Sequence, residues 1–186
     1  ERIDDLQVAG LKIIQNKNLF CFGTDAVLLH HFVEPKNLKK VVDFGTGTGI
    51  LSVLLGGKNK NIEVFALEIQ PALFEMATRS VEMNNLSNVH IINGDLKDAY
   101  KLVGRCDAVM CNPPYEKCGS ALSSENNSHK IAREEICCNF DDIAKSAGQV
   151  LGDGGSFYFI HRAPRFTEIT QTLKKYNLMP KKVRFI

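Results

Sequence analysis

The sequence of 186 residues has no apolar run that approaches the roughly 20 residues needed to span a bilayer. It also has no signal-peptide pattern before its first strand pattern, and it has no low-complexity tract. Its six cysteines include no C-x-x-C pair, and none has histidines at zinc-ligand spacing. We therefore expect a cytoplasmic globular protein with reduced thiols, no membrane contact and no bound metal.

Positive charge is concentrated at one end of the chain. The net charge is only +2, but residues 145–186 carry eight Lys or Arg against Asp153 and Glu168, which gives 8 − 2 = +6 for that segment. A basic segment of this kind suits contact with the phosphates of a nucleic acid. Solvated helix faces and charges that protect an edge strand explain the same pattern equally well.

Apolar stretches rich in Val, Ile and Phe alternate with helical patterns along the chain. This alternation predicts an α/β fold with a doubly wound, mostly parallel sheet between two layers of helices, which makes three layers. The expected strands are 39–45, 62–68, 89–94, 106–112, 155–161 and a last one at 181–186. The expected helices are 49–55, 71–85, 131–151, which Asp153, Gly154 and Gly155 would stop, and 164–176.

The two ends of the chain do not follow this alternation. Residues 1–35 are predicted to form an N-terminal cap with a short helix that begins at Thr24 or Asp25, and 36–186 to form the main domain. The chain stops at what would be a sixth strand, without a returning hairpin strand. We therefore expect a C-terminal piece to be missing, and the oligomeric state stays open.

A glycine-rich turn follows the first predicted strand in "VVDFGTGTGI". Glycine lets the backbone approach a ligand closely, because it has no Cβ. The dinucleotide spacing G-x-G-x-x-G fails, since Ile50 stands at the third glycine position. The spacing suits S-adenosylmethionine, which has a charged amino-acid tail and a ribose but no pyrophosphate. The residues predicted to hold this cofactor here are Asp43, Gly45, Thr46 and Gly47.

Acidic residues end the next two predicted strands. Glu68 comes 19 residues after Gly49, where a carboxylate can accept both ribose hydroxyls. Asp95 follows the third strand in "INGD", near where the adenine amino group of the cofactor would lie. Ligands of open α/β sheets bind at the carboxyl ends of the strands. The combination therefore predicts a cofactor site, although each acid alone would fit a solvated strand end or a turn.

The fourth predicted strand runs into Asn112, Pro113, Pro114 and Tyr115. An exocyclic amine on a base is a poor nucleophile, because its lone pair is delocalised into the ring. Two acceptors for its N–H hydrogens, the Asn112 side-chain oxygen and the Pro113 carbonyl, would let the nitrogen pyramidalise. The prolines would hold these acceptors rigid, and Tyr115 would stack on the ring. The alternative is a strand end with a Pro-Pro turn and a half-buried ring.

These stretches resemble the class I S-adenosylmethionine-dependent N-methyltransferases of the Asn-Pro-Pro-Tyr type. Within that group the chain resembles the bacterial enzymes that methylate N6 of the adenine 3′ of the anticodon, at position 37, in a valine tRNA. "LKIIQNKNLFCFGTDAVLLHHFV", "VVDFGTGTGILSVLL" and "CNPPYEKCGS" carry the resemblance. It implies a Rossmann-like fold, cofactor contacts from Gly45, Gly47 and Glu68, and an adenine held by residues 112–115. It also implies that Phe22, Gly23, Thr24 and Asp25 close over the methionine end of the cofactor.

The candidates for contact with tRNA phosphates are Lys130, Arg133 and, in the basic C-terminal segment, Arg162 and Arg165. Residues 116–130 are predicted to be a loop that orders on substrate, or an ordinary surface loop. Two residues depart from the family pattern: Glu116 follows the tyrosine, and Glu134 replaces a histidine in "AREE". These departures concern substrate contacts more than the chemistry.

Other functions fit part of the sequence. Methylation of a glutamine side-chain amide in a release factor poses the same problem of a delocalised lone pair, but such enzymes usually carry a larger N-terminal domain. DNA adenine methyltransferases normally add a target-recognition domain, for which 186 residues leave no room. A cofactor-binding module without catalysis, acting as an RNA-binding or assembly factor, is a further alternative.

Overall fold

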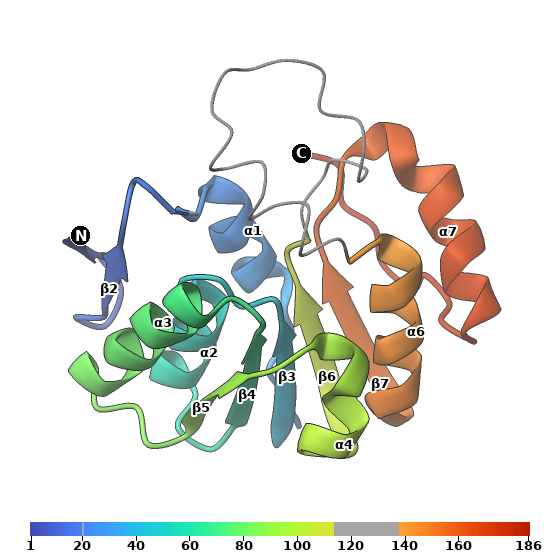
Figure 1. The fold of residues 1–186 in the computed structure, drawn as a ribbon. Helices are drawn as coiled ribbons and strands as arrows, with labels where there is room; N and C mark the ends of the chain where they lie inside the picture. The colour runs from blue at the N-terminus through green and yellow to red at the C-terminus, as the bar shows by residue number, and fades with distance from the viewer. Residues whose placement is uncertain (20, 114–137) are drawn as a thin grey trace.

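A computed structural model describes residues 1–19, 21–113 and 138–186 (Figure 1). Five parallel strands form one sheet in the order β5-β4-β3-β6-β7, and helices cover both of its faces. The predicted doubly wound, three-layer α/β fold is confirmed. The strands are β1 Arg2–Asp5, β2 Lys12–Gln15, β3 Lys40–Phe44, β4 Glu63–Glu68, β5 Val89–Asn93, β6 Cys106–Cys111 and β7 Leu151–Phe159. The helices are α1 Thr24–Phe32, α2 Ile50–Lys58, α3 Pro71–Met83, α4 Ala99–Val103, α6 Phe140–Val150 and α7 Phe166–Lys175, with short 3-10 helices η1 Leu96–Asp98 and η2 Ala163–Arg165.

The sheet divides the hydrophobic core into two layers. Successive side chains of a strand point to opposite faces, so Val41 of β3 packs with α1 and α2 while Val42 and Phe44 pack with α4 and α6. All three side chains are fully buried. Helix α7 lies outside α6 and packs on Phe140 through Ile169. Burial on both faces explains why the central strands have near-continuous apolar sequences.

An N-terminal hairpin of β1 and β2 precedes α1, and the sequence patterns did not predict it. Its strand β2 docks on α3 through side-chain bonds to its backbone. The Asn84 amide accepts from the Lys12 N–H at 2.8 Å and donates to the Lys12 carbonyl at 2.6 Å, and the Ser80 hydroxyl accepts from the Ile14 N–H at 3.0 Å. Each strand has only four residues, too few for a periodic signal.

Two predictions at the C-terminal end are wrong. Of the helix expected at 131–151, residues 131–137 lie outside the described part of the chain; α6 begins at Phe140 and ends at Val150, and β7 begins directly at Leu151 rather than at 155. The glycines expected to stop the helix lie instead inside β7, at a register irregularity opposite Cys106. The segment 181–186, expected to be a strand, pairs with no strand in the described part of the chain and its side chains are exposed. A strand forms only where a neighbour satisfies its backbone groups.

The other expected elements form within a few residues of their predicted bounds. Helix α1 begins at Thr24, with Gly23 as its N-cap residue, and its buried side chains share one core cluster with those of β3 and α2. Helix α4 is an addition to the prediction. None of the helices in the described residues is both long and apolar enough to span a membrane. The four described cysteines are free thiols.

Candidate functional site

The carboxyl ends of β3, β4 and β6 lie side by side at one edge of the sheet (Figure 1). Phe44, the last residue of β3, is in register with Leu67 of β4 and with Cys111 of β6. Ligands of open α/β sheets bind outside this edge. The residues that come next, one from each strand, are Gly45, Glu68 and Asn112.

The glycine turn between β3 and α2 has a backbone conformation that residues with a Cβ rarely adopt. Gly45, Gly47 and Gly49 have φ angles of 63°, 58° and 87°, in the left-handed region. A Cβ on Gly49 would lie 3.3 Å from the Ala77 Cβ, because the turn packs against α3 there. A Cβ on Gly45 would meet no described heavy atom within 4 Å. Gly49 is therefore needed for packing, whereas Gly45 leaves the backbone open to a ligand.

Glu68 is buried, and backbone donors orient its carboxylate. Its Oε2 accepts from the Gly47 N–H at 2.8 Å and its Oε1 accepts from the Gln70 N–H at 2.9 Å. Burial raises the pKa of Glu68 above its ordinary value, against the opposing effect of these N–H donors. Each carboxylate oxygen has a lone pair to spare, so two further hydroxyl donors can be accepted without loss of orientation.

Asp43 lies beneath the glycine turn and is almost fully buried. The hydroxyls of Thr46 and Ser52 donate to its Oδ2 at 2.6 and 2.7 Å. Burial raises the pKa of Asp43 to about 6, although both hydroxyl bonds oppose the shift. Its Oδ1 and the Thr48 Oγ1 are buried without a hydrogen-bond partner among the described residues. Unsatisfied buried oxygens are costly, so the turn fits a ligand that brings polar donors, such as the ammonium group of a methionine tail.

Ser52 and Thr48 are the site residues that the sequence patterns did not single out. Both side chains are fully buried: Thr48 lies within the glycine turn, and Ser52 lies in the first turn of α2. A buried hydroxyl needs a hydrogen-bond partner, so a serine or threonine among apolar residues is the feature of the sequence that could have indicated a polar contact here. Ser52 has that partner in Asp43, nine residues earlier in the chain.

Asp95 follows β5 and begins η1. Its Oδ1 accepts from the Lys97 N–H at 2.9 Å, and its Oδ2 lies 3.5 Å from the Lys97 Nζ. The side chain therefore acts as a helix cap, an ordinary role for aspartate at this position. It stands two residues beyond Asn93, which is in register with Glu68. Its contact with a cofactor adenine stays a prediction.

The segment 21–25 joins the N-terminal hairpin to α1. Phe22 packs against the core cluster that contains Ile50 at the start of α2, directly after the glycine turn. Thr24 is exposed, and Asp25 lies in the first turn of α1. The start of α1 lies at the same end of the molecule as the arrowheads of β6 and β7 (Figure 1). The segment is thus at the sheet edge that carries the glycine turn.

Asn112 and Pro113 follow β6 at this edge, half-buried and buried respectively. Phe44 and Cys111 are in register, so Gly45 and Asn112 are the residues that directly follow this pair on the two neighbouring strands, and the acceptor role of Asn112 stays a prediction. Of the predicted site residues, four lie outside the described part of the chain: Pro114, Tyr115, Lys130 and Arg133. The predicted loop 116–130, Glu116 and Glu134 also lie outside it.

Arg162 and Arg165 follow β7, which is parallel to β6, so both residues come after the carboxyl end of a strand of the same sheet. The Arg165 guanidinium pairs with the Glu168 carboxylate at 2.6 Å and lies 3.2 Å from the His161 Nε2. Burial and the Arg165 charge lower the pKa of His161 to about 4, so its ring is neutral at pH 7. Phosphate contact by Arg165 would compete with Glu168.

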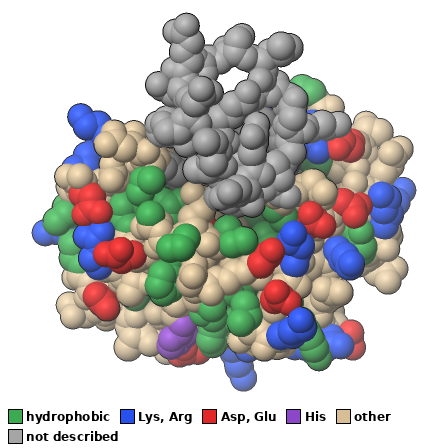
Figure 2. Space-filling view, in the orientation of Figure 1, with side chains coloured by type: hydrophobic (Ala, Val, Ile, Leu, Met, Phe, Trp, Pro, Cys, Tyr) green, Lys and Arg blue, Asp and Glu red, His purple; other side chains and the backbone are tan. Residues whose placement is uncertain are grey.

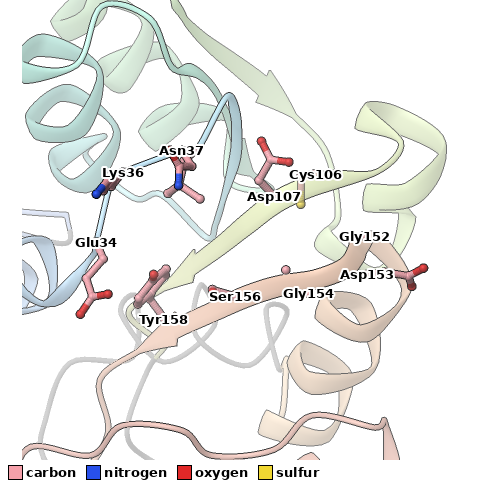
Figure 3. A pocket seen from close by; sticks show the side chains of 12 residues that line it. Glu34, Lys36, Asn37, Cys106, Asp107, Gly152, Asp153, Gly154, Ser156 and Tyr158 are labelled. Carbon is pink, nitrogen blue, oxygen red and sulfur yellow. The ribbon is translucent and has the colours of Figure 1, made fainter.

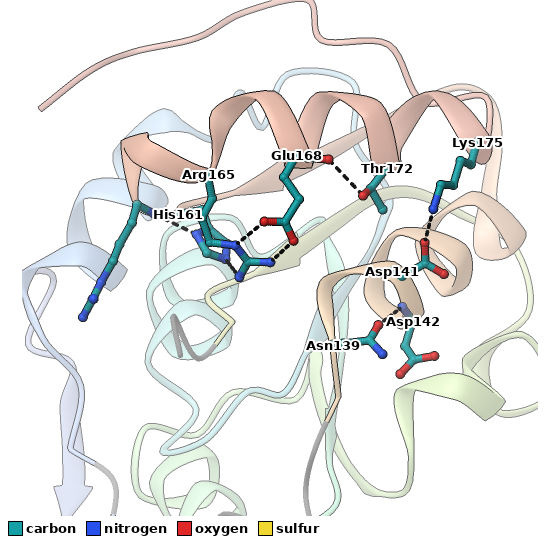
Figure 4. Close-up of polar contacts among 9 residues, drawn as sticks. Asn139, Asp141, Asp142, His161, Arg165, Glu168, Thr172 and Lys175 are labelled. Atoms are coloured by element: carbon teal, nitrogen blue, oxygen red, sulfur yellow. Dashed lines mark hydrogen bonds and ion pairs between the residues drawn. The ribbon is translucent and has the colours of Figure 1, made fainter. Parts of the chain in front are cut away.

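The basic C-terminal segment is partly neutralised by ion pairs. Arg165 pairs with Glu168, Lys175 with Asp141 at 3.1 Å (Figure 4), and Lys182 with Glu34 at 2.5 Å. On the face shown in Figure 2, basic and acidic side chains are interspersed. The excess of positive charge in residues 145–186 is therefore smaller at the surface than in the sequence. The basic segment alone does not identify a nucleic-acid surface.

A cavity of about 470 Å³ lies at the opposite ends of β6 and β7 (Figure 3). Its walls include Glu34 and Lys36 from the α1–β3 connection, Asp107 at the start of β6, and Tyr158 of β7. The Asp107 carboxylate is engaged by the Lys39 and Lys40 N–H groups at 2.8 Å each. Most of its lining lies at the amino ends of β6 and β7, so the cavity is distinct from the edge that carries the glycine turn. Within the described residues no group of three or more His, Cys, Asp or Glu side chains is arranged to hold a metal.

Comparison with curated proteins finds relatives that include two of the same name. The tRNA1(Val) (adenine(37)-N6)-methyltransferase of Aliivibrio salmonicida (strain LFI1238) is 30% identical over 156 residues, which are 83% of this chain and 65% of the relative. The protein of the same name from Glaesserella parasuis serovar 5 (strain SH0165) is 28% identical over 139 residues, 74% of this chain and 57% of the relative. The chain thus spans less than two thirds of the length of either relative.

Solved methyltransferase structures share the fold. Precorrin-6y C5,15-methyltransferase from Geobacter metallireducens GS-15 has a TM-score of 0.65 at 13% identity, over 89% of this chain and 77% of that one. TrmN from Thermus thermophilus has a TM-score of 0.59 at 16% identity, over 86% and 42%. A family model described as "Methyltransferase small domain" matches residues 10–186. Because this match covers nearly the whole chain, the protein belongs to the methyltransferase small domain family.

Proposed function

We propose that the protein transfers a methyl group from S-adenosylmethionine to the exocyclic N6 amine of an adenine in tRNA, at position 37 beside the anticodon of a valine tRNA. One observation carries this proposal: the glycine turn, the Glu68 carboxylate and Asn112 lie at the carboxyl ends of three neighbouring strands, at one edge of the sheet. Family membership supports the reaction, and the names of the relatives support the substrate.

The residues around the glycine turn suit the cofactor. S-adenosylmethionine, when bound, supplies a methyl group on a positively charged sulfur. Gly45 and Gly47 would bring backbone close to it, and the Glu68 carboxylate would accept the ribose hydroxyls. Asp43 would contribute negative charge near the methionine tail, and Asp95 would face the adenine amine. Residues 22–25 would close over the methionine end.

Asn112 and Pro113 would hold the acceptor nitrogen. The Asn112 side-chain oxygen and the Pro113 carbonyl accept the two N–H hydrogens, which draws the nitrogen lone pair out of the ring system. Pro113 has a restricted φ and is buried, so its carbonyl is held in one direction. No base is needed before transfer, because the product amine loses its proton to water afterwards. The contribution of these residues is positioning.

Substrate contacts complete the proposal. Tyr115 would stack on the target base beside Pro114, since bases in single-stranded loops are open to such contacts. Lys130, Arg133, Arg162 and Arg165 are proposed to contact tRNA phosphates. A base that lies in the anticodon loop is already unpaired, so little free energy is needed to extrude it.

Radiolabelled S-adenosylmethionine tests the function. The protein is incubated in parallel with the anticodon stem-loop of valine tRNA, the same stem-loop with guanine at position 37, duplex DNA, and a release factor. We expect label in the first RNA and none in the other three. Label in the release factor alone would replace the proposal by glutamine methylation, for which the Asn112 acceptor geometry is equally suited. Cofactor binding without label in any substrate would indicate a non-catalytic module.

A further inference from the structure

Gln15, the last residue of β2, is placed to hold the segment that precedes α1. We infer that Gln15 is a positioning residue for the cofactor: it holds residues 22–25 against the methionine end of S-adenosylmethionine. The inference rests on the proposed function, because that function assigns residues 22–25 to the cofactor. It adds a residue from the N-terminal hairpin, which has no part in the proposed chemistry.

The side-chain amide of Gln15 joins three segments of the chain. Its Oε1 accepts a hydrogen bond of 3.2 Å from the Phe22 N–H, seven residues later. Its Nε2 donates to the Asp4 Oδ2 on the neighbouring strand β1. Asp4 in turn accepts from the Arg2 Nε at 3.0 Å. The amide therefore links both strands of the hairpin to the backbone at the start of the cofactor segment.

Packing alone does not explain a glutamine at this position. Gln15 is 3% exposed, and it follows Ile13 and Ile14, which are buried in two separate hydrophobic clusters. Burying an amide costs free energy unless its donor and acceptor find partners, whereas an aliphatic side chain would be stabilising there. The bonds to Asp4 and Phe22 offset that cost. Because β1 and residues 21–25 are largely exposed or only half-buried, the amide between them serves to fix their relative positions more than to add buried apolar area.

The hairpin that carries Gln15 is itself anchored to the helix that follows Glu68. The Lys12 and Ile14 backbone groups bond to Asn84, the C-cap residue of α3, and to Ser80 in its last turn. Helix α3 begins at Pro71, three residues after Glu68. The hairpin is thus linked by hydrogen bonds to α3, and α3 is linked through the chain to the Glu68 carboxylate. Gln15 extends this link to the Phe22 backbone. The residues proposed for the ribose and those proposed for the methionine end are thereby held in fixed positions relative to each other.

Loss of the Gln15 bond has a defined expected effect. The Phe22 ring would still pack on the core, but its N–H would lose a buried acceptor and residues 22–25 would sample more conformations. Ordering residues 22–25 on cofactor binding would then cost more conformational entropy in the variant than in the wild type, which weakens binding. Asn112 lies on another strand, so the rate at saturating cofactor should not change. The signature is a raised KM and Kd for cofactor with an unchanged kcat.

The experiment compares Gln15→Leu, Gln15→Glu and the double variant Asp4→Asn, Gln15→Glu. We expect Gln15→Leu to raise the calorimetric Kd of S-adenosylmethionine roughly fivefold, which is the size of one net hydrogen bond. Gln15→Glu keeps the acceptor for Phe22 but places a carboxylate against Asp4, and it should weaken binding as well. The double variant exchanges donor and acceptor between the two positions, and it should return the Kd to within about twofold of wild type.

Asn88→Ala is the matched control for a general loss of stability. Asn88 is also a buried amide, and its Nδ2 faces the carbonyls of Gly56, Asn59 and Ile62 near the amino ends of β4 and β5. This variant should lower Tm yet leave the cofactor Kd unchanged. If Gln15→Leu does not fold, the Gln15→Glu and double variants decide the question.

The outcomes separate the inference from the function on which it rests. Wild-type protein that binds no cofactor would refute the proposed function itself. Wild-type binding with an equal Kd in Gln15→Leu or Gln15→Glu would overturn the positioning role and leave the function standing. Failure of the double variant to recover the loss in Gln15→Glu, or an equal rise in Kd for Asn88→Ala, would also overturn it.

Discussion

The Gly47 N–H donates a hydrogen bond of 2.8 Å to the Glu68 Oε2. This bond joins the glycine turn after β3 to the acid that ends β4, so the backbone that would approach the cofactor and the carboxylate that would bind its ribose move together. The Gln70 N–H holds the other oxygen of the same carboxylate. Changes at either position should therefore act on cofactor affinity before they act on the rate of transfer.

Glu68→Gln should weaken cofactor binding. The amide keeps the size of the side chain but sets an NH₂ group against the N–H of either Gly47 or Gln70, and it removes the charge that favours ribose hydroxyls. Bonds to a charged group contribute about 1.5–3 kcal/mol, so we expect at least a roughly tenfold rise in Kd by calorimetry. Glu63→Gln, at the exposed start of the same strand, is the control and should leave Kd unchanged. Equal affinity in Glu68→Gln would remove Glu68 from the cofactor site.

Asn112→Ala should abolish methyl transfer and retain cofactor binding. The change removes one of two acceptors for the target amine, and loss of a group that positions reacting atoms costs on the order of a hundredfold or more in rate. Single-turnover assays with labelled cofactor measure the rate, and calorimetry measures the affinity. A parallel loss of both quantities would mean that Asn112 supports the fold of the edge instead.

Asp43 should make stability depend on pH in a direction opposite to most carboxylates. Its pKa is about 6 in the folded protein against 3.8 ordinarily, so the folded state binds a proton that the unfolded state has already lost. The resulting stabilisation is fully present below pH 3.8 and is lost as the pH rises through about 6; it amounts to roughly 3 kcal/mol.

Denaturant unfolding of wild type and Asp43→Asn from pH 4 to pH 8 measures this effect, because the difference between the two isolates Asp43 from other acids. We expect the stability of wild type relative to Asp43→Asn to fall across that range. A difference that stays constant with pH would show that Asp43 titrates at its ordinary value. A bound cationic cofactor should shift the dependence to lower pH, since it favours the ionised carboxylate.

Gly45→Ala and Gly49→Ala should separate binding from packing. Both force an alanine into a left-handed backbone, which costs about 1 kcal/mol each. The Gly49 substitution adds a Cβ at 3.3 Å from the Ala77 Cβ, so it should lower Tm further, and Ala77→Gly should recover part of that loss. The Gly45 substitution points its Cβ into the space for ligand, so it should raise the cofactor Kd more than Gly49→Ala does.

Arg162→Gln should weaken tRNA binding through one phosphate contact. The slope of log K against log salt should then fall in magnitude by about 0.7–0.9, as expected for one lost contact. Lys60→Gln, at the amino end of the sheet between α2 and β4, serves as the control and should keep the wild-type slope. Filter binding at several salt concentrations supplies the measurement, and an unchanged slope in Arg162→Gln would exclude the contact.

The sequence patterns predicted the five strands of the sheet because the apolar composition of a buried strand is a property of a few consecutive residues. Residues 40–44 and 106–111 are mostly apolar on both faces, and such runs favour buried parallel strands. The boundary at Leu151 differs from the prediction because Asp153, Gly154 and Gly155 have the composition of a helix stop. In the structure they accommodate an irregular pairing between β7 and Cys106, which depends on a strand distant in sequence.

By itself, the amino-acid sequence determined the fold class, the glycine turn and the acids at strand ends, since hydrophobic period, backbone restriction and charge are properties of short segments. Tertiary structure alone decided which of these meet: the register that sets Gly45, Glu68 and Asn112 at one level, the Gly47 bond to Glu68, and the hairpin held by α3. Those contacts join residues far apart in the chain, and their geometry exists only when the layers have packed.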